Sequence, residues 1–403
     1  MTDPEQLITR IQEGDLKLYE LEEEYDADVA TMARRKFIAS ATDTDFSTIE
    51  DYSFPANQAS ANIENMIGAT QVPIGVAGPL CIQSGNSVTE YYLPLATTEG
   101  ALVASVNRGC AIIDQAGGVS ATVFKNGMTR APVFRVKNVI EAKAVVDWIE
   151  DNYQKLQQAA ESTTNHGELT DISPYIVGDS VFVRFIYDTK DAMGMNMATI
   201  ATEKAAEIIE TETSASLVAL SGNLCSDKKP AAINAIEGRG RTVAADITIP
   251  RSVIQNRFDT DPEAIVEINT RKNLLGSAKA GSIGFNAQTA NIVAAMFLAT
   301  GQDIAQVVEG SNGIASMETR NGDLYASITI ASLEVGTIGG GTTLPTQSEA
   351  LNLIGIQGGG DPPGQNADIL AKTIAGGALA GELSLLGALA SNNLASAHEK
   401  LGR

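Results

Sequence analysis

The sequence predicts an α+β protein in which a ferredoxin-like βαββαβ unit is inserted into a large α/β domain, with a small helical domain in front. Three observations lead to this prediction. The chain has 403 residues, of which 44% are hydrophobic, so it can bury a core large enough for two or three domains. Helix-start signals dominate the N-terminal segment. Between residues 131 and 221 the expected elements follow the βαββαβ order.

The N-terminal segment opens with a strong helix-start signal. Asp3 is a suitable N-cap, Pro4 fits the first helical position, and Gln6 can complete a capping box. A second helix is expected over residues 29–38. We therefore predict a helical N-terminal domain over residues 1–63.

Two stretches that follow mix apolar residues with glycine, proline or threonine. Residues 64–79 suit a tight extended path that a backbone or ligand can approach, although a buried turn before a strand would look the same. In residues 93–105, Thr97 or Thr98 is expected to cap a helix. Glu99 in its first turn would then be an ordinary partner of the helix dipole, unless it also faces a cleft.

The inserted unit is predicted from its periodicity, with Gly178-Asp179 as a hairpin signal between two strands. The expected elements are a strand over 133–136, a helix over 139–160, strands over 169–177 and 180–188, a helix over 198–209 and a strand over 216–220. The inserted domain is thereby placed at residues 132–220, between two parts of a larger domain at 64–131 and 231–403.

The motif Asp191-Ala-Met-Gly-Met-Asn196 lies at a strand-to-helix junction of this unit. Gly194 permits a close approach of another group, and the N-terminus of the following helix favours phosphate. A methionine-rich turn that fills the domain core is an equally good interpretation.

Residues 221–230 have the composition of an irregular loop. Gly222-Asn223 tolerates left-handed backbone angles, and Pro230 disfavours a helix just before it. The triplet Asp-Lys-Lys at 227–229 therefore lies outside regular structure. A solvated surface turn is the ordinary interpretation of such a charge run, and an anion-binding loop is the alternative.

The second part of the larger domain contains further helix and turn signals. Asp261-Pro262 starts a helix, and a very apolar helix over 291–299 ends at Gly301. Asp303 would cap a following helix. Asn321-Gly322 predicts a hairpin.

A glycine-rich stretch, Gly336–Thr342, follows the second hairpin strand. It matches neither the Rossmann fingerprint nor the P-loop, so it is either a phosphate cradle or a bulge. The tail over residues 369–398 is rich in alanine, leucine and glycine, which predicts closely packed helices.

The charge balance is strongly acidic. The 28 Lys and Arg residues stand against 49 Asp and Glu residues, which gives a formal net charge of −21 and a pI of about 4.5. Such a field repels nucleic acids and anionic membranes. It is typical of a halophilic protein, since molar salt screens the repulsion among carboxylates, although an ordinary acidic cytosolic protein is the alternative.

Cysteine and histidine usage argues against disulfides and metals. Cys81, Cys110 and Cys225 cannot all pair and lack metal-ligand spacing. Neither His166 nor His398 has a second ligand nearby, but His398 could titrate near neutral pH if the tail covers a site. The sequence has no leader signal and no run of about 18 apolar residues, so we expect a soluble, cytoplasmic protein.

These motifs occur together, in order, in one known family. They are ENMIG…VAGP at 64–79, TTEG at 97–100, DAMGMN at 191–196, SGNLCSDKKPAAIN at 221–234, GQD at 301–303, GTIGGGT at 336–342 and the terminal His398. With them, residues 63–398 resemble class I, biosynthetic 3-hydroxy-3-methylglutaryl-CoA (HMG-CoA) reductases, of a soluble archaeal type from a halophile.

The resemblance implies a homodimer, or a dimer of dimers, with active sites at the subunit interface. The large domain would bind HMG-CoA and the inserted domain NADPH. Two NADPH per turnover would reduce the thioester by four electrons to mevalonate and CoA, for isoprenoid biosynthesis and without a metal. Residues 221–230 would be the connecting catalytic loop.

The resemblance also implies catalytic roles. Lys228 would polarise the thioester carbonyl and stabilise the oxyanion, Glu99 would donate a proton, and Asp303 would orient both. His398 would protonate the departing CoA thiolate. The chemistry suits these roles, because hydride delivery builds negative charge on oxygen and imidazole is an acid near neutral pH.

The implied binding residues form three groups. The acyl chain would be held by Arg130, Ser221, Asp227, Lys229, Lys272 and Asn291. CoA would be contacted by Ser105, Asn107 and Arg108. The dinucleotide would lie on Asp191, Met193, Gly194, Met195 and Asn196, together with Gly339, Gly340, Gly341 and Thr342.

Some positions depart from the family pattern. Ala69 and Ala111 stand where animal relatives have a CoA-contacting tyrosine and arginine, and residues 162–166 lack the arginine expected near a 2′-phosphate. The preference for NADPH over NADH is therefore implied only by the resemblance to class I enzymes. The alternatives are a degradative, NAD-dependent oxidation of mevalonate and a catalytically silent CoA-binding protein on the same fold.

Overall fold

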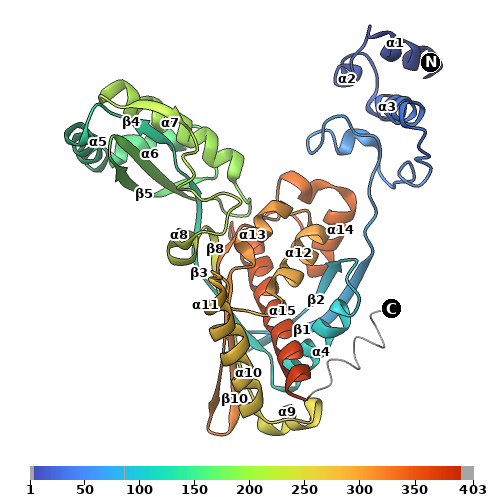
Figure 1. Cartoon of the computed structure of the whole chain (residues 1–403), viewed down its shortest axis with the longest axis vertical. Helices are drawn as coiled ribbons and strands as arrows, with labels where there is room; N and C mark the ends of the chain where they lie inside the picture. The colour runs from blue at the N-terminus through green and yellow to red at the C-terminus, as the bar shows by residue number, and fades with distance from the viewer. Residues whose placement is uncertain (1–3, 86, 392–403) are drawn as a thin grey trace.

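The computed structural model describes residues 4–85 and 87–391. Its N-terminal part is helical, with α1 (Pro4–Glu13), α2 (Leu21–Glu24), α3 (Ala27–Thr42) and the short η1 (Ala56–Gln58). Leu7, Leu21 and Ala30 form a small core of their own. The helices lie apart from the main body (Figure 1). The two predicted helices are confirmed; the predicted cap Asp3 lies outside the described residues.

The main body contains a large sheet with the strand order β2-β1-β3-β8-β10-β9. Its strands are β1 (Ile74–Ser84), β2 (Ser87–Ala96), β3 (Val119–Arg130), β8 (Gly240–Ile249), β9 (Gly313–Arg320) and β10 (Asp323–Leu333). The β1–β3 pair is parallel and the other pairs are antiparallel. Asn321 and Gly322 both have positive φ, as the predicted β9–β10 hairpin turn requires.

Helices pack on this sheet around α15 (Gln365–Ala390), which is buried along most of its length. A Cβ on Gly109 would collide with the backbone of Ala380, so α4 (Leu102–Gln115) packs very closely on α15. The other elements are α8 (Ala232–Glu237), α9 (Arg251–Phe258), α10 (Pro262–Ile268), the π-helix η2 (Asn269–Gly276), α11 (Ser277–Ala280), α12 (Thr289–Thr300), η3 (Ile304–Gln306), α13 (Val307–Gly310), η4 (Gly340–Thr343) and α14 (Pro345–Ile354).

The length and hydropathy of α15 would allow it to cross a membrane, although polar residues interrupt its apolar sequence. However, 83% of its most apolar window is buried inside the protein. Figure 1 shows it running through the centre of the main body. Its apolar character is accounted for by its place in the core.

The small unit has the strand order β7-β4-β6-β5, with all pairs antiparallel. Its elements are β4 (Val133–Arg135), α5 (Val139–Asp151), α6 (Tyr153–Glu161), β5 (Glu168–Val177), β6 (Ser180–Asp188), α7 (Met195–Glu212) and β7 (Ser216–Ala219). They follow the predicted order, except that the long first helix is two helices. The break is at Asn152, whose φ of −112° and ψ of 21° are not helical.

The small unit and the main body share a strand. Most of β3 pairs with β8 in the large sheet, but its last residues, Met128–Arg130, pair with β6 of the small sheet. The chain returns through residues 221–230. Figure 1 shows the small unit beside the upper end of the main body.

Other predictions were incomplete or wrong. The helix after residue 100 begins at Leu102, following Ala101 with a φ of 71°, so neither threonine caps it. Thr97 Oγ1 instead accepts a hydrogen bond from the backbone N–H of Glu99 in a local turn. The strand β1 occupies the second half of the stretch 64–79.

Candidate active site

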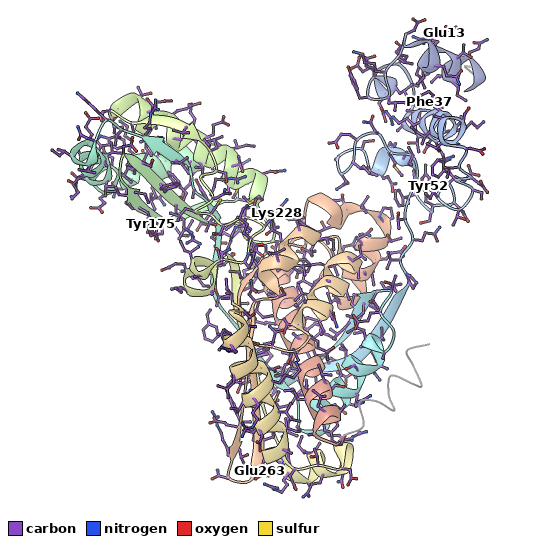
Figure 2. All side chains as sticks on the ribbon, viewed as in Figure 1. Glu13, Phe37, Tyr52, Tyr175, Lys228 and Glu263 are labelled. Carbon is purple, nitrogen blue, oxygen red and sulfur yellow. The ribbon has the colours of Figure 1, made fainter. Side chains whose placement is uncertain are left out.

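The loop 221–230 carries Lys228 to the junction of the small unit and the main body (Figure 2). Its backbone is left-handed at three non-glycine residues, Asn223, Ser226 and Lys228. The Lys228 ammonium lies 3.2 Å from Asp303 Oδ2, and 47% of the lysine side chain is exposed. The charge of Lys228 is therefore both paired and accessible to a ligand.

Asp303 is held in place from its other side. It is the N-cap of η3, and its Oδ1 accepts a hydrogen bond of 3.0 Å from the backbone N–H of Ala305. The predicted capping role is confirmed. The same carboxylate thus caps a helix and pairs with Lys228.

Asp227 points the opposite way, into the protein. Its Oδ1 accepts hydrogen bonds from Gln306 Nε2 at 2.9 Å and from Arg239 Nη2 at 3.1 Å. Burial alone would raise the pKa of Asp227, but Gln306 and the positive charges of Arg239 and Lys228 together lower it. Asp227 is therefore an ionised anchor of the loop.

Sequence reasoning missed the residues behind this anchor. The buried guanidinium of Arg239 forms ion pairs with two buried glutamates, Glu309 and Glu334. Burial raises the pKa values of both glutamates, and the charge of Arg239 opposes this rise. An acidic residue inside the apolar sequence Leu333-Glu334-Val335 was the available signal, because such a carboxylate is seldom buried without a partner.

The other predicted acyl-binding residues of this loop lie close by. Ser221 Oγ is 3.4 Å from Cys225 Sγ, and Lys229 Nζ donates to the carbonyl of Asp227. Arg130 donates from Nε and Nη2 to Thr199 on α7. Burial raises the pKa of the Cys225 thiol, but Ser221, a backbone N–H and nearby arginines outweigh it and lower the pKa.

Glu99 and Asn291 form a second group. Asn291 Nδ2 donates to Glu99 Oε1 at 3.2 Å, and Glu99 is exposed. Asn291 is in the first turn of α12, whereas Asp303 follows its end. Since α12 has 12 residues, its length is about 18 Å. Within one chain, Glu99 thus contacts Asn291 at the start of α12, and Lys228 contacts Asp303 just beyond its end.

Lys272 lies on the π-helix η2, a feature often found at functional sites. Its Nζ is 3.4 Å from Asn273 Oδ1. The neighbouring Glu382 is buried and accepts hydrogen bonds from the backbone N–H groups of Ala287 and Gln288. Burial raises the pKa of Glu382, although these hydrogen bonds and Lys272 act against it.

The predicted CoA residues lie on α4, but two of them already have partners in the protein. Ser105 Oγ donates to Ser384 Oγ on α15, and Asn107 Oδ1 accepts from the backbone N–H of Gly78. Arg108 is half-buried. The structure therefore gives Ser105 and Asn107 hydrogen bonds within the protein that the sequence did not indicate.

The two predicted dinucleotide segments contact each other. Ala192 and Ile338 form a parallel bridge, and the backbone N–H of Thr337 donates to the carbonyl of Asp191 at 2.8 Å. The Asp191 carboxylate is buried and accepts three hydrogen bonds from the backbone of residues 360–367. This carboxylate therefore joins the start of α7 to residues 360–367 of the main body, and a contact between Asp191 and the dinucleotide stays a prediction.

Backbone is open to space where these segments meet, at Gly339 and Gly340 and at the start of α7, and we call this part the glycine cradle. Added Cβ atoms would meet nothing within 4 Å at Gly339 and Gly340, so their backbone faces open space. No side chain in the described part of the chain caps the first turn of α7 after Gly194, so its N–H groups are available to an anion. These features fit a phosphate-bearing dinucleotide. Gly341 packs against Gly301, two residues from Asp303, so the cradle adjoins the Lys228–Asp303 pair.

Residues 4–85 and 87–391 contain no group of three His, Cys, Asp or Glu side chains that could hold a metal. The three cysteines are free and buried. Of the predicted catalytic residues, His398 lies outside the described part of the chain.

Comparison with known proteins shows the family to which the chain belongs. Residues 30–403 match the family model described as hydroxymethylglutaryl-coenzyme A reductase. The chain belongs to the HMG-CoA reductase family. It is 64% identical to the 3-hydroxy-3-methylglutaryl-coenzyme A reductase of Haloferax volcanii over the full length of both chains, and 64% identical to that of Halobacterium salinarum over 100% of this chain and 99% of the relative.

Solved structures of HMG-CoA reductases share the fold. A class II enzyme from Streptococcus pneumoniae, bound to NADPH in open conformations, has a TM-score of 0.68 at 19% identity, with 96% of this chain and 97% of that chain covered. At this identity the likeness concerns the mixed α/β fold of the HMG-CoA reductase family.

Proposed function

We propose that the chain reduces HMG-CoA to mevalonate and CoA, with two NADPH per turnover. The observation that carries this proposal is the Lys228–Asp303 pair beside an open glycine cradle. A cationic group next to a dinucleotide cradle suits a carbonyl that receives hydride. Relatives at 64% identity that are named as this reductase support it.

The residues of this chain would donate protons and stabilise the negative charge that forms on the substrate oxygen. The ammonium of Lys228 polarises the thioester carbonyl and stabilises the oxyanion, while Asp303 keeps that ammonium oriented. Glu99 donates a proton during reduction of the aldehyde, and His398 protonates the CoA thiolate. NADPH, when bound, supplies the hydride.

Two of the domains would each bind one of the two reactants. Residues 64–131 and 231–403 bind HMG-CoA, and residues 132–220 bind NADPH. Residues 221–230 connect them and carry the catalytic lysine. Residues 1–63 form a separate helical domain, in agreement with their own hydrophobic cluster.

The active site would be shared between subunits of a homodimer or of a dimer of dimers. Glu99 and Lys228 attach to opposite ends of α12, about 18 Å apart. A two-fold axis can bring the Glu99 end of one chain to the Lys228 end of another. Each site would then need residues from two chains.

The chain would be a class I, cytoplasmic enzyme that works in molar salt. Its net charge of −21 and its identity to enzymes of Haloferax and Halobacterium support a halophilic origin. Salt would screen the repulsion among its carboxylates.

NADPH absorbance in molar KCl tests the proposal. Purified protein with HMG-CoA should oxidise two NADPH per mevalonate formed. It should oxidise NADPH faster than NADH. Removal of salt should abolish the activity. Reduction of NAD with mevalonate and CoA, without oxidation of NADPH by HMG-CoA, would favour a degradative oxidoreductase. Binding of CoA without either reaction would mean a silent binding protein.

A further inference from the structure

The catalytic loop adopts a conformation that it cannot hold by itself. Ser226 has a φ of 52° and Lys228 a φ of 60°, which are unfavourable for side chains other than glycine, asparagine and aspartate. The Lys228–Asp303 ion pair is partly exposed, with 47% and 32% of the two side chains accessible, so it contributes little to holding the backbone. Such strain persists only where other contacts fix it.

Glu309 supplies such a contact. Its Oε1 accepts a hydrogen bond of 2.8 Å from the backbone N–H of Lys228. The backbone N–H of Lys229 also interacts favourably with the ionised form of this carboxylate. The side chain of Glu309 is fully buried, whereas the bond to the Lys228 N–H is partly buried.

Arg239 connects Glu309 to the rest of the site. Its Nη1 donates to Glu309 Oε1 at 3.3 Å and to Glu334 Oε1 at 3.1 Å. Its Nη2 donates to Asp227 Oδ1 at 3.1 Å and lies 2.8 Å from the sulfur of Met195, in the proposed dinucleotide segment. One buried guanidinium therefore touches both the loop and the cofactor side.

The charges in this cluster do not balance. Asp227, Glu309 and Glu334 surround one guanidinium, with Lys228 and Arg130 acting on Asp227 from outside. Oε2 of Glu309 and Oε2 of Glu334 are buried and have no hydrogen-bond partner among the described residues. The raised pKa values of both glutamates agree with a proton retained in the cluster.

We propose that Glu309 is a positioning residue for Lys228. Glu309 fixes the backbone of residues 228–229, and Arg239 fixes the positions of Glu309 and Asp227. The effect on catalysis rests on the proposed reductase function. The effect on the loop conformation does not.

The test compares Glu309→Ala, which removes the acceptor, with Glu309→Gln, which keeps an acceptor oxygen at the same place. Glu318→Gln is the control, because Glu318 lies on strand β9 with an exposed side chain. Glu309→Ala should lower kcat about 10- to 100-fold, with KM for HMG-CoA within about 3-fold, because the backbone N–H of Lys228 loses its acceptor. Glu309→Gln should restore most of kcat. If Glu309 only stabilised the fold, alanine and glutamine variants with equal melting temperatures would have equal kcat.

Hydrogen exchange of the peptide that contains residues 221–230 supplies a readout independent of activity. Glu309→Ala should increase its exchange rate, and Glu309→Gln and Glu318→Gln should not. If Glu309→Ala does not fold, Glu309→Asp replaces it, since its shorter side chain cannot reach the Lys228 N–H.

The outcomes separate the two proposals. An inactive wild-type protein with faster loop exchange in the alanine variant would reject the reductase function and keep the positioning role. An active wild type with unchanged exchange and with kcat of Glu309→Ala within about 2-fold would overturn the positioning role. Equal damage by alanine and glutamine at equal stability would also overturn it.

Discussion

The two ends of α12 hold their charged groups in different ways. At its C-terminal end, Asp303 is fixed by the backbone of Ala305 and paired with Lys228. Buried residues behind this pair hold the loop through several hydrogen bonds. At the N-terminal end, Glu99 is exposed and accepts one amide hydrogen bond from Asn291.

Under the proposed function, the difference separates an end that this chain fixes by itself from an end that it leaves open. An ammonium that stabilises an oxyanion needs fixed placement, and the Lys228 end provides it. Under the proposed function, substrate and a partner subunit would complete the surroundings of Glu99.

Removal of the fixed ammonium should have the largest effect. We expect Lys228→Ala to lower kcat about 10³-fold, because oxyanion stabilisation is lost, while NADPH binding measured by fluorescence is retained. Lys125→Ala is a matched control, since Lys125 is an exposed lysine paired with Glu237. An active Lys228→Ala enzyme would contradict the assigned role.

Mixed dimers test whether the two ends meet across an interface. Glu99→Gln and Lys228→Ala proteins should each be nearly inactive alone. When the two are unfolded and refolded together, half of the dimers would be mixed, each with one intact site. We therefore expect activity to recover to about a quarter of the wild-type value. No recovery, with mixed dimers verified by mass spectrometry, would place both residues in a site within one chain.

The buried carboxylates should make stability depend on pH, and this is the smallest of the three effects. Burial raises the pKa of Glu309 to about 7 and of Glu334 to about 8, from an ordinary value of 4.5. Because the folded state holds these protons more tightly, their stabilisation is complete below pH 4.5. It is lost as pH rises through 7 to 8.

At constant molar salt, the melting temperature of the wild type should fall by about 2–4 °C between pH 6 and pH 9. Glu334→Gln should show a smaller fall, because one of the two titrating groups is gone. Calorimetry measures both proteins, and identical curves for wild type and Glu334→Gln would contradict the prediction.

Local signals predicted much of the fold. The turns at Gly178 and Asn321-Gly322 and the helix end at Gly301 follow from the backbone preferences of single residues, and all three are confirmed. The strands β3 and β8 were missed. Both pair with partners far away in the chain, and their small and polar residues give a weak alternating pattern.

The candidate site shows the same division. Lys228 and Asp303 were found through motifs and lie in contact. Arg239, Glu309 and Glu334 were not found, because 70 and 95 positions separate the arginine from its two glutamates. Asp191 was recognised by its motif, but only coordinates could reveal that its carboxylate holds the backbone of residues 360–367.

The strand β3 has a mechanical consequence. Two covalent crossings join the small unit to the main body, and one of them, β3, is paired on both sides of the junction. A rotation of the small unit about β3 would leave the pairings of β3 intact, but it would disturb the Ala192–Ile338 bridge. Because the other crossing is the loop 221–230, such a rotation would also move the Lys228 ammonium. The hydrogen bonds of the Asp191 carboxylate to residues 360–367 are among the contacts that would oppose it.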